Sequence, residues 1–123
     1  MTASGSVRLG ALFAGLGVAL GAFGAHAMKT RFPAEALQTF ETGVRWQMYH
    51  ALALLACGVL EVQGFRTRAA ARLFALGILL FSGSLYAFVF TGLHPLVFVT
   101  PVGGVAFLLG WLALLVRGTT RSQ

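Results

Sequence analysis

The 123-residue chain has few charged side chains, and acidic ones are especially scarce. Charged residues make up 10% of the sequence, with three Asp or Glu against nine Lys or Arg, whereas hydrophobic residues make up 58%. A soluble domain normally carries about 25% charged residues, so this small chain lacks the polar side chains needed to cover its surface. Intrinsic disorder is excluded for the opposite reason, because disordered chains are poor in apolar residues. The composition therefore predicts a single-domain integral membrane protein.

The sequence also lacks the motifs of common enzymes and of nucleic-acid-binding proteins. Its only cysteine, Cys57, lies in an apolar run, cannot form an intramolecular disulfide and is typical of a small buried hydrophobic residue. There is no phosphate-binding glycine loop, no Ser/His/Asp order and no zinc motif, so we expect no enzymatic activity and no cofactor. The formal charge of +6 comes from basic residues that flank apolar runs, which is typical of membrane proteins, so we expect no nucleic-acid partner.

Four apolar stretches are long enough to cross a bilayer, which takes about 20 residues in helical form. They cover about residues 7–28, 46–63, 69–91 and 97–116. Helices are required because hydrocarbon offers no partner to free backbone groups. Short connections after the second and third stretches favour antiparallel packing of consecutive helices. The predicted fold is all-α, an integral membrane four-helix antiparallel bundle.

The longer connection between the first two stretches predicts one more helix. Pro33 can begin it, and Glu35 then falls in the first turn, where an acidic side chain is favourable. Apolar residues recur at spacings of three and four, at Leu37, Phe40, Val44 and Met48. We interpret residues 33–44 as an interfacial helix that bends into the second span near Gly43. An ordinary polar loop is the alternative.

The first apolar stretch resembles a secretory signal peptide, because Arg8 precedes it and Ala25-His26-Ala27 has the form of a cleavage site. Its apolar run of about 20 residues is longer than the 7 to 15 residues of a signal peptide. Small residues also fall on one face, at Gly10, Ala14, Gly17, Gly21 and Gly24. Such a face lets helices pack closely, as do Gly103 and Gly104 in the fourth stretch. We therefore expect the first helix to be retained.

The distribution of basic residues predicts the orientation in the membrane. With four spans, both termini and the middle loop share one side, which holds Arg8, Arg66, Arg68, Arg72, Arg117 and Arg121. The other side holds Lys29, Arg31 and Arg45. Because cytoplasmic segments carry the excess of basic residues, we expect both termini to lie in the cytoplasm.

Polar residues concentrate in the outer half of this predicted arrangement. The candidate network consists of His26, Glu41, Arg45, Gln47, Tyr49 and His50. Glu41 and Arg45 have the i,i+4 spacing of a helical ion pair, and Ser82 and Tyr86 share a face of the third stretch. One interpretation is that His26 and His50 form hydrogen bonds between helices and fix their register. A proton relay or a headgroup site is another, and a metal or haem site at His26 and His50 is a third.

Four segments of the chain resemble one known family. They are residues 21–27 (GAFGAHA), 41–53 (ETGVRWQMYHALA), 81–86 (FSGSLY) and 100–104 (TPVGG). In order and spacing they are similar to a family of small inner-membrane proteins catalogued as domain of unknown function 423. Two positions depart from its pattern, since Trp46 stands where tyrosine is common and Gly43 where alanine is. The resemblance implies a four-helix protein of the bacterial cytoplasmic membrane, and it brings no activity, cofactor or catalytic residue.

These observations lead to one main functional hypothesis and two alternatives. The main hypothesis is a non-enzymatic accessory or interaction component of a membrane complex, with lipid and either copies of itself or larger subunits as partners. One alternative is a small oligomeric transporter or channel that uses the outer polar cluster and needs a water-accessible cavity reaching past His50 towards Ser82 or Ser84. The other is metal or haem binding, which needs His26 and His50 within reach of one point.

Overall fold

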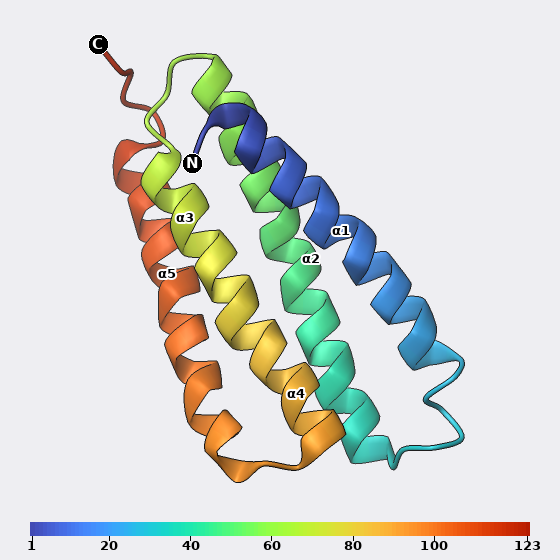
Figure 1. The fold of residues 1–123 in the computed structure, drawn as a ribbon. Helices are drawn as coiled ribbons and strands as arrows, with labels where there is room; N and C mark the ends of the chain where they lie inside the picture. The colour runs from blue at the N-terminus through green and yellow to red at the C-terminus, as the bar shows by residue number, and fades with distance from the viewer.

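The computed structural model describes all 123 residues and is all-helical, with 81% helix and no strands. The elements in chain order are α1 (Ala3–Ala25), α2 (Ala34–Val62), α3 (Arg68–Gly77), the π-helical turn η1 (Ile78–Ser82), α4 (Gly83–Thr91), the 3-10 turn η2 (His94–Phe98) and α5 (Val99–Arg117). Because α3, η1 and α4 follow one another without a break, the chain forms four long helical stretches (Figure 1). The all-α architecture predicted from composition is confirmed.

The long helices lie side by side, and each runs opposite to the one before it (Figure 1). Both termini and residues 63–67 therefore lie at one end of the molecule, and residues 26–33 and 92–98 lie at the other. In the middle, α2 packs against α1 on one side and against α3, η1 and α4 on the other. At the edges, α1 packs almost entirely on α2, and α5 packs mainly on α3 and η1. Each outer helix thus keeps one side free of contact with the chain.

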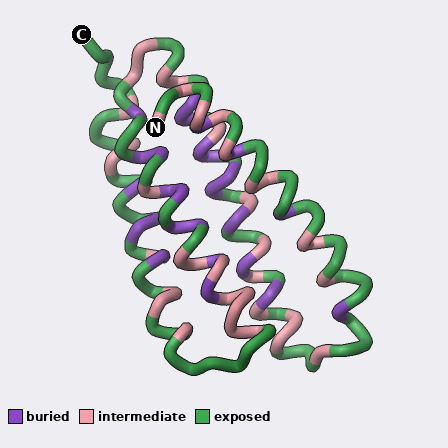
Figure 2. The backbone as a smooth tube through the Cα atoms, viewed as in Figure 1, coloured by how far each residue is buried: buried purple, intermediate pink, exposed green.

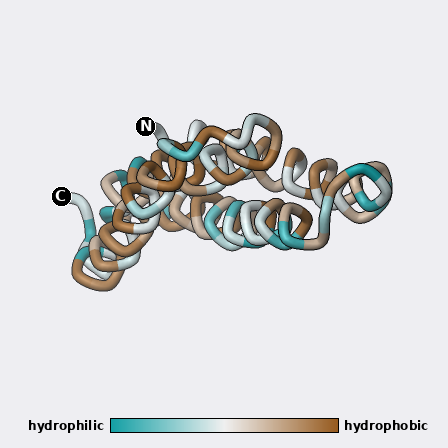
Figure 3. The backbone as a smooth tube through the Cα atoms, turned by 90° about the horizontal axis from the view of Figure 1, so that it is seen from below, coloured by the Kyte–Doolittle hydropathy of each residue, from teal (hydrophilic) through white to brown (hydrophobic).

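Three stretches are long and apolar enough to cross a membrane, namely Ala3–Ala25, Arg68–Thr91 and His94–Arg117. Apolar colouring dominates the helical turns in Figure 3, and hydrophilic colouring is limited to shorter stretches. The predicted second span, over residues 46–63, is not among the three, although α2 has 29 residues. Polar side chains lower its apolar character, and two of them, Gln47 and His50, are buried against the neighbouring helices.

The interfacial helix predicted over residues 33–44 does not exist as a separate element, because these residues form the first turns of α2. The helix begins directly after Pro33, with Glu35 in its first turn, and continues past Gly43 to Val62. At Gly43 the missing side chain makes room for the ring of Tyr86. The Gly43 carbonyl also accepts a hydrogen bond from Ser82 Oγ at 2.6 Å. A glycine in a helix can serve close packing as well as bending, and here the contacts from η1 and α4 support a continuous helix.

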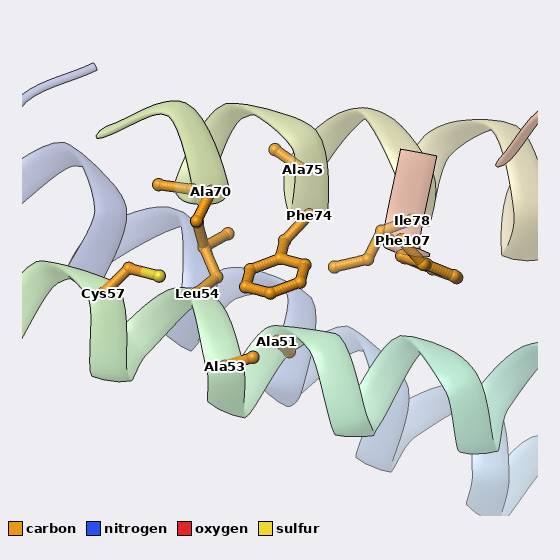
Figure 4. Close-up of a cluster of buried hydrophobic side chains, with 10 residues drawn as sticks. Ala51, Ala53, Leu54, Cys57, Ala70, Phe74, Ala75, Ile78 and Phe107 are labelled. Carbon is orange, nitrogen blue, oxygen red and sulfur yellow. The ribbon is translucent and has the colours of Figure 1, made fainter. Parts of the chain in front are cut away.

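The hydrophobic core lies between α2, α3 and α5 (Figure 4). Phe74 of α3 points towards α2, where Leu54 is fully buried, and Phe107 reaches the same cluster from α5. Alanines fill most of the remaining positions, which allows the helix backbones to approach closely. Buried positions gather along α2 and α3 in Figure 2, whereas the outer sides of α1 and α5 are exposed.

Glycines mark the closest helix contacts. A Cβ added at Gly10 would lie 2.9 Å from the Ala51 carbonyl oxygen, and one at Gly103 would overlap the backbone of Phe81. Among the other glycines predicted to pack helices, Gly17 and Gly24 also lie in tight contacts, whereas Gly21 and Gly104 meet their neighbours at ordinary distances. The sequence interpretation missed Gly58 and Gly77, which make equally close contacts with α1 and with Phe107.

Candidate functional site

The predicted polar network does not form one cluster. His26 is exposed and follows the last residue of α1. Glu41 and Arg45 form the expected ion pair at 3.1 Å, and both side chains are exposed. Tyr49 is also exposed and contacts Trp46 edge to face. Gln47 and His50 are instead buried, with 3% and 2% of their surface exposed, and each belongs to a separate interior group.

Gln47 joins three helices through hydrogen bonds. Its amide Nε2 donates to the Phe13 carbonyl of α1 at 2.7 Å, and its Oε1 accepts from the Tyr86 hydroxyl of α4 at 2.6 Å. Gly43 lies one turn earlier in α2, next to Ser82 and the ring of Tyr86. We call Gln47, Tyr86 and Ser82 the Gln47 network. The side chains of this network form hydrogen bonds with one another or with nearby carbonyls. Polar groups that are buried away from water need such partners.

His50 lies near the middle of α2, at the centre of an aromatic cluster formed with Trp46, Phe74, Phe107 and Trp111. Its Nε2 accepts a hydrogen bond from Trp111 Nε1 at 3.0 Å. Because an indole N–H only donates, the proton of His50 is on Nδ1, which donates to the Trp46 carbonyl at 2.8 Å. The imidazole also stacks on Phe107, with ring centroids 3.5 Å apart. Both ring nitrogens are thus engaged within the chain.

Two further buried hydroxyl groups, those of Ser84 and Thr67, are also bonded within the chain. Ser84 Oγ donates to the Phe81 carbonyl at the wide turn η1 and pairs with the Thr100 hydroxyl of α5. Thr67 Oγ1 donates to the Cys57 carbonyl at 2.7 Å. Two buried side-chain oxygens have no partner, Ser6 Oγ and Glu61 Oε2, and both lie near the end that holds the termini.

Five cavities of the structure lie at the ends and on the surface of the helices, and none of the five is lined by His50, Ser82 or Ser84. One of them, a groove of about 460 Å³, lies between the end of α1 and the start of α2 and includes Lys29 and Glu41. The cavity that a pathway through one chain requires is therefore not present past His50.

The structure does not bring together His26 and His50, the two histidines of the alternative metal or haem site. Gly24 packs on Phe40 and Gly10 packs on Ala51, which fixes the antiparallel register of α1 and α2. His26 is thus level with the first turns of α2, and His50 lies roughly ten residues further along, or about 15 Å. In addition, no group of three or more His, Cys, Asp or Glu is placed to hold a metal ion.

Sequence reasoning missed the partners that give Gln47 and His50 their roles. The shared face of Ser82 and Tyr86 was a usable signal for the Gln47 network. Trp111 was harder to recognise, because a tryptophan near the end of an apolar helix is also typical of the membrane interface. Its hydrogen bond to His50 instead directs the indole into the helix contact.

The long apolar helices and the bonded polar interior define the class: a small α-helical membrane protein. Residues 20–104 match the family described as "protein of unknown function (DUF423)", and the chain belongs to this family. The resemblance seen in the four sequence segments is thereby confirmed.

Named relatives agree with this class. The chain is 46% identical over 114 residues to the UPF0382 membrane protein YwdK of Bacillus subtilis, which covers 89% of this chain and 92% of the relative. It is 45% identical over 101 residues to a UPF0382 membrane protein of Haemophilus influenzae, covering 79% of each chain. It is also 43% identical over 101 residues to the UPF0382 inner membrane protein YgdD of Escherichia coli, covering 80% of this chain and 77% of the relative. No solved structure matches the chain.

Proposed function

We propose that this chain is a non-enzymatic, multi-pass protein of the bacterial inner membrane that acts as an accessory component of a membrane complex. The filled interior supports a role that depends on the surface, because Gln47, His50 and Tyr86 are engaged with other groups of the chain. A substrate could reach none of them without displacing packed side chains. The inner membrane is the location printed for YgdD of Escherichia coli.

In this proposal α2 is a fourth span, and the four helices cross the membrane as an antiparallel bundle. Its length of 29 residues is sufficient, and it lies between helices that are themselves apolar enough to span. The buried side chains of Gln47 and His50 in α2 are hydrogen-bonded within the chain, which removes the main cost of placing them in hydrocarbon. The end with both termini carries the excess of arginine, so the positive-inside rule places it in the cytoplasm.

The observation that carries the accessory role is a face of small residues on the outer side of α1. Ala11, Gly15 and Ala19 follow one another at intervals of four and are all exposed. A Cβ added at Gly15 would meet nothing within 4 Å. Faces of this kind let a second helix approach closely in a membrane. The other small-residue face of α1, with Gly10 and Gly17, is covered by α2.

Native mass spectrometry of the full-length protein, extracted from its own membrane in mild detergent, tests this proposal. The wild-type chain is expected to retain the mass of another subunit, and Gly15→Leu should remove it because the new side chain blocks the outer face of α1. Gly83→Leu is the matched control, since Gly83 of α4 is also open, with nothing within 4 Å. A bare 13.0 kDa wild-type monomer, or equal loss in both variants, would contradict the accessory role.

The transporter alternative gives a different outcome in the same experiment. Since one chain has no central cavity, a pathway would have to lie between copies and would require a defined homo-oligomer. The exposed Glu41–Arg45 pair would then be its polar entrance. A homo-oligomer whose ion or proton flux in liposomes falls in the Glu41→Gln variant would favour transport over the accessory role.

A further inference from the structure

Basic side chains gather at the end of the molecule where both termini lie. Six of the nine Lys and Arg residues belong to this end, together with a single acidic residue, Glu61. We propose that this end binds the phosphate group of an anionic phospholipid through Arg66, Arg72 and Arg117, and that an acyl chain of the same lipid lies between α3 and α5. This inference rests on the membrane placement proposed above and is independent of the accessory role.

The arginines line a cavity of about 740 Å³. Its walls come from segments far apart in the sequence: the start of α1, the end of α2 with Glu61, residues 64–66, the start of α3, the last residue of α5 and the C-terminal tail. The volume is within the range of about 300–1,000 Å³ that is usual for ligand sites. Four arginines therefore line one space, namely Arg66, Arg68, Arg72 and Arg117.

Most of this positive charge is not neutralised within the chain. Glu61 Oε1 pairs with Arg68 Nε, and the Glu61 side chain is only 11% exposed. Arg66, Arg72 and Arg117 have no acidic partner within 4.0 Å. The cavity thus presents three unpaired guanidinium groups, which suit phosphate oxygens because each can donate two parallel hydrogen bonds.

Backbone pairing holds the rim of the cavity in place. The Arg66 N–H donates to the Thr120 carbonyl at 2.9 Å, and the Ser122 N–H donates to the Gly64 carbonyl at 2.7 Å. The Arg121 guanidinium also lies over the Phe65 ring, 5.0 Å from its centroid. The C-terminal tail is therefore fixed to the loop before α3, so the arginines of the two segments share one site.

The start of α3 adds to the attraction for an anion. Its N-cap residue, Thr67, donates its hydroxyl hydrogen to Cys57, so no side chain caps the first amides of α3. No acidic residue lies in the first turn either. The free N–H groups and the helix dipole favour negative charge at this position, next to Arg68 and Arg72.

An apolar groove beside the cavity distinguishes a lipid from a free phosphate ion. The groove has a volume of about 350 Å³, lies between α3 and α5 and shares Ala69 and Arg117 with the arginine cavity. Its remaining walls are apolar, formed by Leu73, Leu109, Leu112, Ala113 and Val116. A charged cavity at the helix ends that continues into an apolar groove along them matches a phospholipid, with its phosphate at the membrane surface and its chain in the hydrocarbon.

Lipid titration of the full-length protein in mild detergent, followed by native mass spectrometry, tests this inference. Phosphatidylglycerol is expected to be retained in preference to phosphatidylcholine of the same chain length. Removing one basic charge near an anionic headgroup weakens binding roughly five-fold, so Arg72→Gln with Arg117→Gln should weaken phosphatidylglycerol binding about 25-fold. Arg31→Gln with Arg45→Gln removes the same charge at the opposite end and should change binding less than about two-fold.

Two further measurements distinguish lipid binding from misfolding and from binding of a free phosphate ion. Arg72→Lys with Arg117→Lys keeps the charge and should retain most of the lipid preference, which distinguishes a binding defect from misfolding. Inorganic phosphate and glycerol phosphate lack acyl chains, so millimolar amounts should leave phosphatidylglycerol bound. Displacement by these ions, equal retention of the two lipids, or equal loss in the control pair would overturn the inference. Gly15→Leu should leave the lipid preference unchanged, so failure of the accessory role does not affect this result.

Discussion

At the scale of single residues, the buried polar side chains of Gln47 and His50 form hydrogen bonds with other groups of the chain. Gln47 has its donor and its acceptor engaged by two different helices, and both ring nitrogens of His50 are bonded. Interhelical hydrogen bonds in membrane proteins contribute about 0.6 kcal/mol on average and up to about 1.7 kcal/mol. The individual bonds are modest, and their main effect is to fix which faces of the helices meet.

Removing the Tyr86 hydroxyl should destabilise the protein measurably. Tyr86→Phe keeps the ring against Gly43 but leaves Gln47 Oε1 without its donor. We expect a loss of about 0.5–1.5 kcal/mol in the free energy of unfolding, measured by titration with SDS in mixed micelles. Tyr49→Phe makes the same chemical change at an exposed side chain without a hydrogen bond and should be neutral. Equal effects in the two variants would show that the bond to Gln47 does not contribute.

The site was only partly predictable at this scale. The spacing of Glu41 and Arg45 along one helix identified their ion pair, which forms. The predicted topology grouped Gln47 and His50 with this pair because they lie at a similar depth, and the structure shows that Gln47 and His50 are buried between helices whereas Glu41 and Arg45 are exposed. Spacing within a helix reports which residues share a face, but it carries no information on which other helix covers that face.

At the scale of helices, η1 and α5 approach each other more closely than any side chain would allow. Gly103 lies directly against the backbone of Phe81 in the π-helical turn, whereas its neighbour Gly104 has only the Phe81 ring at 3.9 Å. A π-helical turn is wider than an α-helical one, and here the Phe81 carbonyl accepts a hydrogen bond from Ser84 Oγ at 2.9 Å. The two adjacent glycines therefore have different roles.

Substituting each of these glycines by alanine should separate the roles. Gly103→Ala places a methyl group into the Phe81 backbone, and such overpacking costs about 1–3 kcal/mol. Gly104→Ala adds the same methyl group in ordinary contact and should stabilise α5 by up to about 1 kcal/mol, because alanine favours helix more than glycine. Thermal unfolding in detergent, followed by tryptophan fluorescence, measures both changes. A destabilised Gly104→Ala variant together with an unchanged Gly103→Ala variant would contradict this packing.

The helices themselves were largely predictable, and α2 was the exception. Apolar length alone identified the stretches that became α1, α3 to α4, and α5. The residues before Trp46 looked interfacial because polar and apolar positions alternate there at helical spacing. They continue α2 because Phe40, Gly43 and Gln47 are covered by α1 and α4, and these contacts depend on distant parts of the chain.

At the scale of the whole molecule, the distribution of charge separates the two ends. Six arginines accompany Glu61 at the end with both termini, whereas the other end carries Lys29, Arg31 and Arg45 together with Glu35 and Glu41. Because cytoplasmic segments of membrane proteins carry the excess of Lys and Arg, this asymmetry predicts the orientation.

Cysteine labelling in intact cells should reveal this orientation. Cys57 is buried, so Cys57→Ala provides a cysteine-free background. In that background Thr30→Cys should react with a membrane-impermeant maleimide from outside, whereas Thr119→Cys should react only after the membrane is disrupted. The reversed labelling pattern would show that both termini lie outside the cytoplasm. Reaction of both positions from outside would contradict their placement at opposite ends.

The central position of α2 has a consequence for biogenesis. When the ribosome has completed α2, only α1 is available to it, and that helix supplies the Phe13 carbonyl for Gln47. Tyr86 and Trp111, which satisfy the remaining polar atoms of Gln47 and His50, are synthesised later. In the proposed membrane arrangement, the hairpin of α1 and α2 therefore lacks these partners until the last helix has been made.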